Sequence, residues 1–535
     1  MKKLGGTYAL LTALFVVMMS LPFLVPHCGF LALFGFVPLL CMERVATLSG
    51  TRRFWIWHYG AFVLWNAFTT FWVCNATIGG GIFAITVNAL QMSLVFGLFR
   101  WVKKRIGGVL PYIFLAAAWI AWERWYLVSA QISWPWLVLG NSFARSIRLI
   151  QWYEITGTLG GSLWVWLTNL GVFGLAVALS DGSWGRWNAK ARTAACTALV
   201  LVFAAPLLWS AVLWKKAAPA PQETLPVAIV QPNIDPYRKF EALPQEGQNE
   251  ILLGLLDGCL ADSSETLLAL APETFTSDVR LDRIAEGKTF RRFRDVLLSH
   301  PGITLLFGAS TYDVYGSQNK PTLTARGLAG AWYDAHNSAL ITDSSARCEV
   351  FHKSKLVVGT ELTPYPRIFV PLDEWLSRKM GVGGLMGRDL GQKEITLLHA
   401  GDVPLGCAIC YESVYGEYCT GYVRKGARLL TIITNDAWWG NTPGYLQHLS
   451  YASLRAIETR RDIARCANTG VSALIDRRGA IVAATPWWEE AVLRGSVGLY
   501  DGESFFVRSG DIVGRLAVFV CILLLGAALF RRSKH

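Results

Sequence analysis

The chain has 535 residues, of which 53% are hydrophobic and only 16% are charged. Average globular chains carry about 25% charged residues, and 23 tryptophans with a mean hydropathy of +0.35 favour a protein of the bilayer. The net charge of +12 does not indicate nucleic-acid binding, because the basic residues cluster beside apolar runs. Several of the eleven cysteines lie inside such runs, so a disulfide framework is not expected.

Eight apolar segments are candidates for membrane helices, since a bilayer core requires about 20 residues per helix. They cover residues 7–25, 28–42, 54–74, 81–101, 109–129, 162–180, 194–214 and 511–530. Lysine and arginine cluster in alternate short loops, which predicts cytoplasmic termini and an outer location for the segment from about 215 to 510. Glu123 and Arg124, near the end of the fifth segment, are expected to pair with each other at the membrane interface.

The segment after the seventh span has the pattern of a soluble α/β domain. Strands are predicted at 227–234, 266–275, 303–310, 337–343, 403–410, 428–436 and 471–479, and helices at 244–257, 283–299 and 446–465. Alternating strands and helices predict layered α/β packing. The expected domains are a membrane domain of seven transmembrane helices (1–214), a linker (215–226), the α/β domain (227–508), and a last transmembrane helix with a cytoplasmic tail (509–535).

Three predicted strands end in reactive groups. "LALAPETF" presents Glu273, "CEVFHKSKLV" presents Lys353 and Lys355, and "VPLGCAIC" ends at Cys410. A carboxylate can take a thiol proton, and a lysine can lower the thiol pKa and stabilise an oxyanion, which suits acyl transfer by a cysteine. Taken singly, each residue also has a structural explanation, as a solvated turn, a solvated strand face or a core cysteine.

Cys407 and Cys410 have the C-x₂-C spacing of some zinc and redox sites. Zinc needs two further ligands, and no second C-x₂-C or H-x₃₋₅-H pattern follows. A thioredoxin-like pair is also disfavoured, because the motif does not open a helix in a βαβ unit. We therefore expect no metal and no cofactor. Cys407 is expected to face the core, on the side of the strand opposite to Cys410.

Longer motifs surround the reactive residues. "HKSKLVVGTELTPY" (352–365), "CYE" (410–412), "NDAWWG" (435–440) and the stretch 447–470 resemble the nitrilase superfamily of carbon–nitrogen hydrolases. With its apolar spans, the whole chain resembles the apolipoprotein N-acyltransferase family of that superfamily. In the family's lysine motif, Leu-Val and Glu follow the catalytic lysine at the third, fourth and eighth places, which selects Lys353 over Lys355 and places the glutamate at Glu361.

The resemblance implies an α-β-β-α sandwich domain joined to about eight transmembrane helices. It also implies a ping-pong acyltransferase with a Glu273, Lys353 and Cys410 triad. The enzyme would take an acyl chain from the sn-1 position of a phospholipid as a thioester. It would pass the chain to the α-amino group of the N-terminal diacylglyceryl-cysteine of an apolipoprotein, the last step of lipoprotein maturation. The residues expected to support the triad or bind substrate are Glu361, Tyr411, Glu412 and Trp438.

The implied partners are the phospholipid donor, the diacylglyceryl apolipoprotein acceptor and the bilayer, with no nucleic acid. The implied location is the bacterial inner membrane, with the catalytic domain on the periplasmic side. Two alternatives remain: a membrane-tethered amidase that uses water as acceptor, and a non-catalytic membrane scaffold. A soluble amide substrate does not need an anchor of eight spans, and the intact triad argues against a decayed domain.

Overall fold

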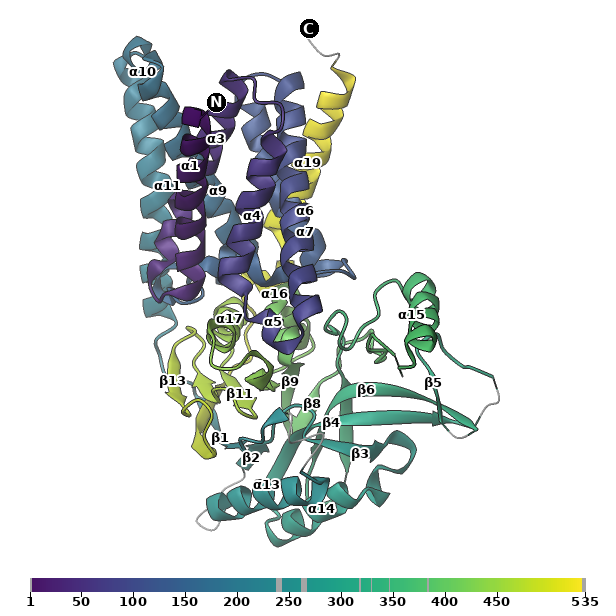
Figure 1. Ribbon diagram of the computed structural model, residues 1–535. Helices are drawn as coiled ribbons and strands as arrows, with labels where there is room; N and C mark the ends of the chain where they lie inside the picture. The colour runs from purple at the N-terminus through teal and green to yellow at the C-terminus, as the bar shows by residue number, and fades with distance from the viewer. Residues whose placement is uncertain are drawn as a thin grey trace. The chain divides into compact units, whose positions relative to one another are not determined.

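The computed structural model describes residues 2–236, 243–260, 267–316, 319–328, 330–345, 347–382 and 384–531. Most of the predicted C-terminal tail therefore lies outside the described residues. The chain divides into two compact units. One comprises residues 1–218 and 508–535, and the other comprises residues 219–507 (Figure 1).

The first unit is helical. Its longer helices are α1 (Lys2–Leu24), α3 (Val37–Leu48), α4 (Phe54–Thr70), α6 (Ile78–Arg105), α7 (Leu110–Val128), α9 (Thr158–Ser180), α11 (Ala189–Lys216) and α19 (Ile512–Phe530). Its short helical turns are η1 (Cys28–Leu31), α2 (Ala32–Gly35), α5 (Val73–Ala76), η2 (Pro135–Leu137), η3 (Leu139–Phe143), η4 (Ile147–Leu149), α8 (Tyr153–Thr156) and α10 (Ser183–Arg186).

Six segments among the described residues are long and apolar enough to cross a membrane. They are Leu4–Leu24, Cys28–Leu48, Ile78–Arg105, Thr158–Ser180, Ala189–Lys216 and Ile512–Phe530. The two other predicted spans correspond to α4, which has 17 residues, and α7, which has 19 and carries two adjacent charges. The structure thus supports a membrane protein with several apolar helices, while the number eight stays a prediction.

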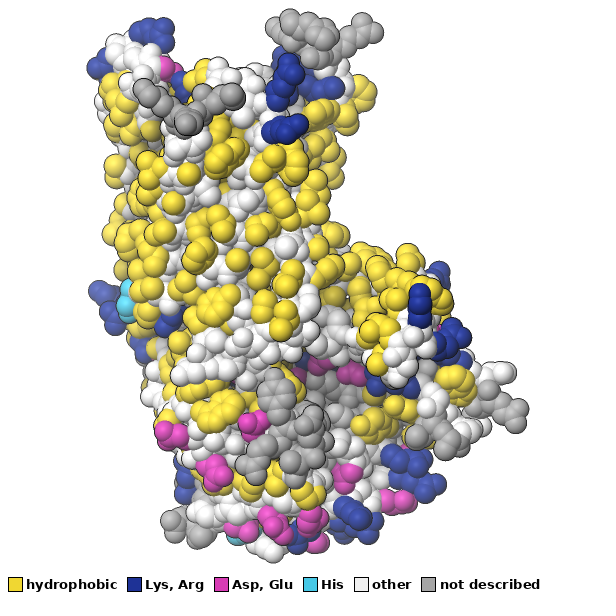
Figure 2. Space-filling view, in the orientation of Figure 1, with side chains coloured by type: hydrophobic (Ala, Val, Ile, Leu, Met, Phe, Trp, Pro, Cys, Tyr) yellow, Lys and Arg dark blue, Asp and Glu magenta, His cyan; other side chains and the backbone are white. Residues whose placement is uncertain are grey.

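On the face of the helical unit that Figure 2 shows, most coloured side chains are apolar. Leu94 in α6 and Phe519 in α19 are each 63% exposed, as expected of groups that contact lipid. The predicted pairing of Glu123 with Arg124 is wrong. Arg124 donates to Asp511 at 2.7 Å, and Glu123 accepts from the backbone N–H of Leu139 at 2.8 Å, because neighbouring residues on a helix point in different directions.

The second unit contains two sheets. The eight-stranded sheet has the order β14-β1-β2-β4-β6-β5, with β3 also paired to β4 and β7 to β6, and the six-stranded sheet has the order β13-β12-β11-β10-β9-β8. The first sheet consists of β1 (Glu223–Gln231), β2 (Leu267–Leu270), β3 (Thr276–Arg280), β4 (Ile303–Tyr315), β5 (Arg326–Leu328), β6 (Ala331–Thr342), β7 (Cys348–His352) and β14 (Ala491–Leu499). The second consists of β8 (Leu398–Ala400), β9 (Val403–Ile409), β10 (Leu429–Thr434), β11 (Ile463–Ala467), β12 (Ala473–Ile475) and β13 (Ile481–Ala484).

Helices and helical turns complete this unit. They are α13 (Gln245–Leu260), η5 (Leu281–Glu286), α14 (Lys288–Ser299), α15 (Pro366–Met380), η6 (Cys410–Val414), α16 (Gly416–Arg424), η7 (Asp436–Trp439), α17 (Pro443–Thr459) and α18 (Phe505–Ser509). The predicted helix 446–465 is too long at its C-terminal end. Arg460 adopts the left-handed conformation (φ 53°) and ends α17, so the residues from Ile463 onward form β11 instead.

Two apolar clusters explain the layers. One joins the facing surfaces of both sheets, for example Ile229 and Leu270 with Ile409 and Ile433, and extends to α16 and α17. The other lies between the opposite face of the eight-stranded sheet and helices α13 and α14. Sheet faces must bury their apolar side chains against another layer, and the result is the expected α-β-β-α sandwich.

Candidate active site

The turn that follows β9 places Cys410 in an unusual backbone conformation. Its φ is 50°, in the left-handed region that a cysteine rarely adopts. The side chain is half-buried, whereas Cys407, Cys419 and Cys466 are fully buried. As expected, Cys407 lies in the core between the sheets. A strained turn at the end of a strand thus keeps one thiol partly accessible.

Glu412 holds this turn against the lysine loop. One carboxylate oxygen accepts from the backbone N–H groups of Ser354 and Lys355, at 2.6 and 3.2 Å, and from the hydroxyl of Tyr418 at 2.9 Å. The other accepts from the N–H of Ile409 at 2.8 Å. Burial raises the pKa of Glu412 to about 7, although the backbone hydrogen bonds oppose that shift. Glu412 therefore acts on the backbone that carries the lysine, while Glu361 contacts the lysine itself.

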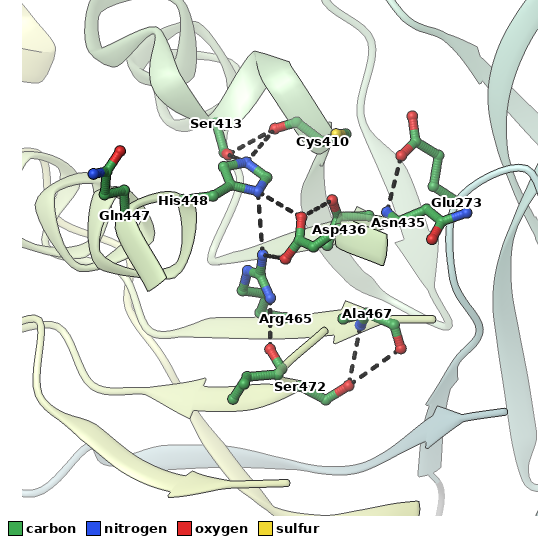
Figure 3. Close-up of polar contacts among 12 residues, drawn as sticks. Glu273, Cys410, Ser413, Asn435, Asp436, Gln447, His448, Arg465, Ala467 and Ser472 are labelled. Atoms are coloured by element: carbon green, nitrogen blue, oxygen red, sulfur yellow. Dashed lines mark hydrogen bonds and ion pairs between the residues drawn. The ribbon is translucent and has the colours of Figure 1, made fainter. Parts of the chain in front are cut away.

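Glu273 follows β2 and is buried, with an exposed fraction of 6%. It lies against Gly308 of β4, where an added Cβ would be only 2.5 Å from the Cα of Glu273, so glycine permits this close approach. One carboxylate oxygen accepts from the Lys353 ammonium at 3.0 Å. The other accepts from the N–H of Asn435 at 3.1 Å, as Figure 3 shows. Glu273 is thus fixed by groups from both sheets.

Lys353 follows β7 and is 1% exposed. Its ammonium lies 3.0 Å from Glu273 and 2.8 Å from Glu361. Burial alone would lower the pKa of Lys353, but the two carboxylates outweigh burial and hold that pKa well above its usual value. The structure places Lys355 elsewhere, over the ring of Tyr415 at 5.3 Å.

Asn337, at the centre of this cluster, was not recognised from the sequence. Its side-chain amide donates to Glu273 and to Glu361, each at 2.8 Å, and its backbone carbonyl accepts from the N–H of Lys353 at 2.8 Å. The sequence gives no distinct signal for it, because Asp334, His336 and Ser338 of the same strand are polar as well. Asn337 therefore aligns both carboxylates with the lysine.

The electrostatics suit a thiol that gives up its proton only during reaction. Burial and the nearby carboxylate of Glu273 raise the pKa of the Cys410 thiol well above its usual value, and the charge of Lys353 opposes this shift. The resting site therefore holds a neutral thiol beside a carboxylate that is bound by an ammonium, an amide and a backbone N–H. This is the arrangement of a nucleophile with a general base and a cationic group.

The other two predicted residues flank the site. Tyr411 is buried, and its ring contacts that of Tyr415 edge-on at 5.2 Å between centroids. Trp438 lies half-buried in η7, next to Trp439. A role for either residue in substrate binding stays a prediction. Across the described residues, no group of three or more histidine, cysteine or acidic side chains is arranged to hold a metal ion.

Comparisons with known proteins match both units. The Carbon-nitrogen hydrolase family model matches residues 227–504, and the Apolipoprotein N-acyltransferase N-terminal domain model matches residues 16–171. The apolipoprotein N-acyltransferase of Chlorobaculum tepidum is 30% identical, over 95% of this chain and 93% of its own length. The apolipoprotein N-acyltransferase of Geobacter metallireducens is 28% identical, over 98% and 96%.

Among solved structures, the match to Saccharomyces cerevisiae Nit3, a member of branch 10 of the nitrilase superfamily, has a TM-score of 0.38 and 15% identity. It covers 55% of this chain and 96% of the Nit3 chain.

Proposed function

The chain belongs to the apolipoprotein N-acyltransferase family of carbon–nitrogen hydrolases, and on that premise we propose that Cys410 carries an acyl chain from a phospholipid to an apolipoprotein. Membership of the family assigns the chain to lipoprotein maturation. The identity of the catalytic groups and the order of steps are the proposal. The observation that carries it is the hydrogen-bonded cluster of Glu273, Asn337, Lys353 and Glu361 near Cys410.

In the first half-reaction, the Glu273 carboxylate takes the proton of the Cys410 thiol while sulfur attacks the sn-1 ester carbonyl. The Lys353 ammonium stabilises the oxyanion, together with a backbone N–H near Tyr411. The carbon–oxygen ester bond then breaks, and Glu273 returns the proton to the departing lysophospholipid oxygen. A thioester on Cys410 remains. Glu361 and Asn337 hold Lys353 and Glu273 in place throughout.

In the second half-reaction, the α-amino group of a diacylglyceryl-cysteine attacks the thioester carbonyl. Glu273 takes a proton from the attacking nitrogen, Lys353 again stabilises the oxyanion, and the carbon–sulfur bond breaks. The proton then passes from Glu273 to the Cys410 sulfur, which restores the starting site. An amide replaces a thioester, and the reaction needs no nucleotide.

The exposed apolar face of helix α15 favours a lipid as the substrate. Ile368, Leu372, Trp375 and Met380 are 66, 43, 52 and 62% exposed, and lysine and arginine side chains lie beside them (Figure 2). An exposed apolar face bordered by cations is typical of a helix that lies in a membrane interface. We propose that α15 contacts the periplasmic surface of the bacterial inner membrane, where the donor and the acceptor are anchored.

The test uses the full-length protein in vesicles of phosphatidylethanolamine with a labelled sn-1 chain and a synthetic diacylglyceryl-cysteine peptide. The proposal predicts labelled N-acyl peptide and an equal amount of lysophospholipid. Release of labelled free fatty acid, with no labelled peptide, would instead support the amidase-like use of water. Full transfer by Cys410→Ala would exclude Cys410 as the carrier.

A further inference from the structure

A buried charged network lies directly behind the nucleophile turn (Figure 3). His448 of α17 places Nε2 3.1 Å from the carbonyl oxygen of Cys410 and 3.0 Å from the Ser413 hydroxyl. Its Nδ1 lies 2.9 Å from Oδ1 of Asp436, and Arg465 of β11 contacts Oδ2 of Asp436 at 2.5 Å. His448 and Asp436 are at most 1% exposed. None of these groups takes part in the two half-reactions above.

The carbonyl of Cys410 has two neighbours that can donate to it. A carbonyl oxygen only accepts, and Ser413 donates its hydroxyl proton to it at 2.7 Å. Nε2 of His448 lies 3.1 Å from the same oxygen, at hydrogen-bond distance. On the other side of the ring, Nδ1 lies 2.9 Å from Asp436 and 3.2 Å from Arg465. Asp436 and Arg465 therefore fix the orientation of the ring that faces the Cys410 carbonyl.

Asp436 is itself held firmly. Burial alone would raise the pKa of Asp436, but the interactions with Arg465 and His448 outweigh burial and keep that pKa well below its usual value. Arg465 also donates to the Val471 carbonyl, and Thr434 donates to Asp436 at 2.9 Å. The carboxylate that orients His448 is thus fixed by β10 and β11.

This network meets the strained part of the site. A left-handed conformation costs a residue with a Cβ free energy, so the φ of 50° at Cys410 persists only where its surroundings hold it. His448 and Ser413 both contact the carbonyl of the same residue. We propose that His448 is a positioning residue that clamps the Cys410 carbonyl by donating to it from Nε2, so that the thiol points at the ester. This inference rests on Cys410 being the nucleophile.

The test compares His448→Gln with the native full-length protein in detergent micelles. The first measurement is the pH profile of Cys410 alkylation by iodoacetamide, quantified on the peptide that contains residue 410, which requires no lipid. Glutamine carries its N–H donors at one end only, so it cannot contact Asp436 and the Cys410 carbonyl as the histidine ring does. We expect the alkylation rate at each pH of the profile to fall about 10-fold. We expect the single-turnover rate of acylation by phosphatidylethanolamine to fall about 10- to 100-fold, with KM for the lipid unchanged.

Two further variants complete the test. Ser413→Ala removes only a neutral donor, so we expect a loss of about 3- to 10-fold in acylation rate. His399→Gln, an exposed histidine on β8, should match the native protein in both measurements. A lower melting temperature for His448→Gln, with native alkylation and acylation, would show a merely structural role and overturn the inference. An equal change in the alkylation profile of His399→Gln would also overturn the inference.

These measurements test the role of His448 separately from the proposed function. If His448→Gln does not fold, a native acylation rate in Ser413→Ala overturns the clamp, and the expected loss supports it. If the native protein forms no thioester at all, the proposed function fails, and the alkylation profiles still decide whether His448 and Ser413 act on the Cys410 thiol.

Discussion

Replacing Asn337 by alanine should slow acylation strongly while leaving the nucleophile in place. The amide of Asn337 donates to Glu273 and Glu361 at 2.8 Å each, in a site where Asn337 itself is 4% exposed. A hydrogen bond to a charged group contributes about 1.5–3 kcal/mol. If alignment of Glu273 accounts for one such bond in the transition state, the acylation rate falls about 10- to 100-fold.

The assay is single-turnover acylation of Cys410 with excess phosphatidylethanolamine, followed by intact mass. Asn249→Ala provides the matched control, because Asn249 is also a buried asparagine of the catalytic unit but bonds only neutral groups, at 3.1 Å to Thr289 and 3.0 Å to Gln245. The control should lose stability and retain the native rate. Native acylation by a folded Asn337→Ala would refute the idea that Asn337 aligns the carboxylates.

Three further predictions address the supports of the site. Burial raises the pKa of Glu412 to about 7, so its carboxylate becomes protonated as the pH falls through 7 and accepts fewer hydrogen bonds from the lysine loop. We therefore expect kcat to fall below pH 7. Glu412→Gln should be slow at every pH and should lack this fall in kcat. Gly308→Ala adds a Cβ 2.5 Å from Glu273, so acylation should fall at least 10-fold, whereas Gly316→Ala, with open space around it, should be native in the same assay. Trp375→Ser should weaken flotation of the separately produced unit 219–507 with vesicles, and Asp295→Asn on α14 should not. Equal binding of the two variants would contradict the role of α15.

Much of the candidate cluster could be predicted because its members follow strands. Glu273 and Lys353 follow strands of the eight-stranded sheet, and Cys410 follows a strand of the six-stranded sheet. Apolar runs precede Glu273 and Cys410, whereas Lys353 follows the mixed stretch CEVFH. The spacing of the lysine motif also selected Lys353 over Lys355, and the structure places only Lys353 between carboxylates. Apolar periodicity likewise indicated most of the membrane helices.

The remaining groups depend on which strands are neighbours, which periodicity does not encode. Asn337 meets the two carboxylates only because β6 lies between β4 and β7 in the sheet. Asp436 and Arg465 meet because β10 pairs with β11. The polar positions of α17 read as an ordinary surface face, yet His448 is buried. Strand β8, of three residues, is also too brief to give a clear pattern.

The central claim is that Cys410 carries the acyl chain, and peptide mass spectrometry tests it most directly. The full-length protein is exposed to phosphatidylethanolamine without acceptor, quenched in acid and digested. The account predicts one acyl chain as a thioester on Cys410, labile to hydroxylamine, absent in Cys410→Ala and present in Cys407→Ala. An acyl chain on another residue, or native N-acylation of the peptide by Cys410→Ala, would contradict the account.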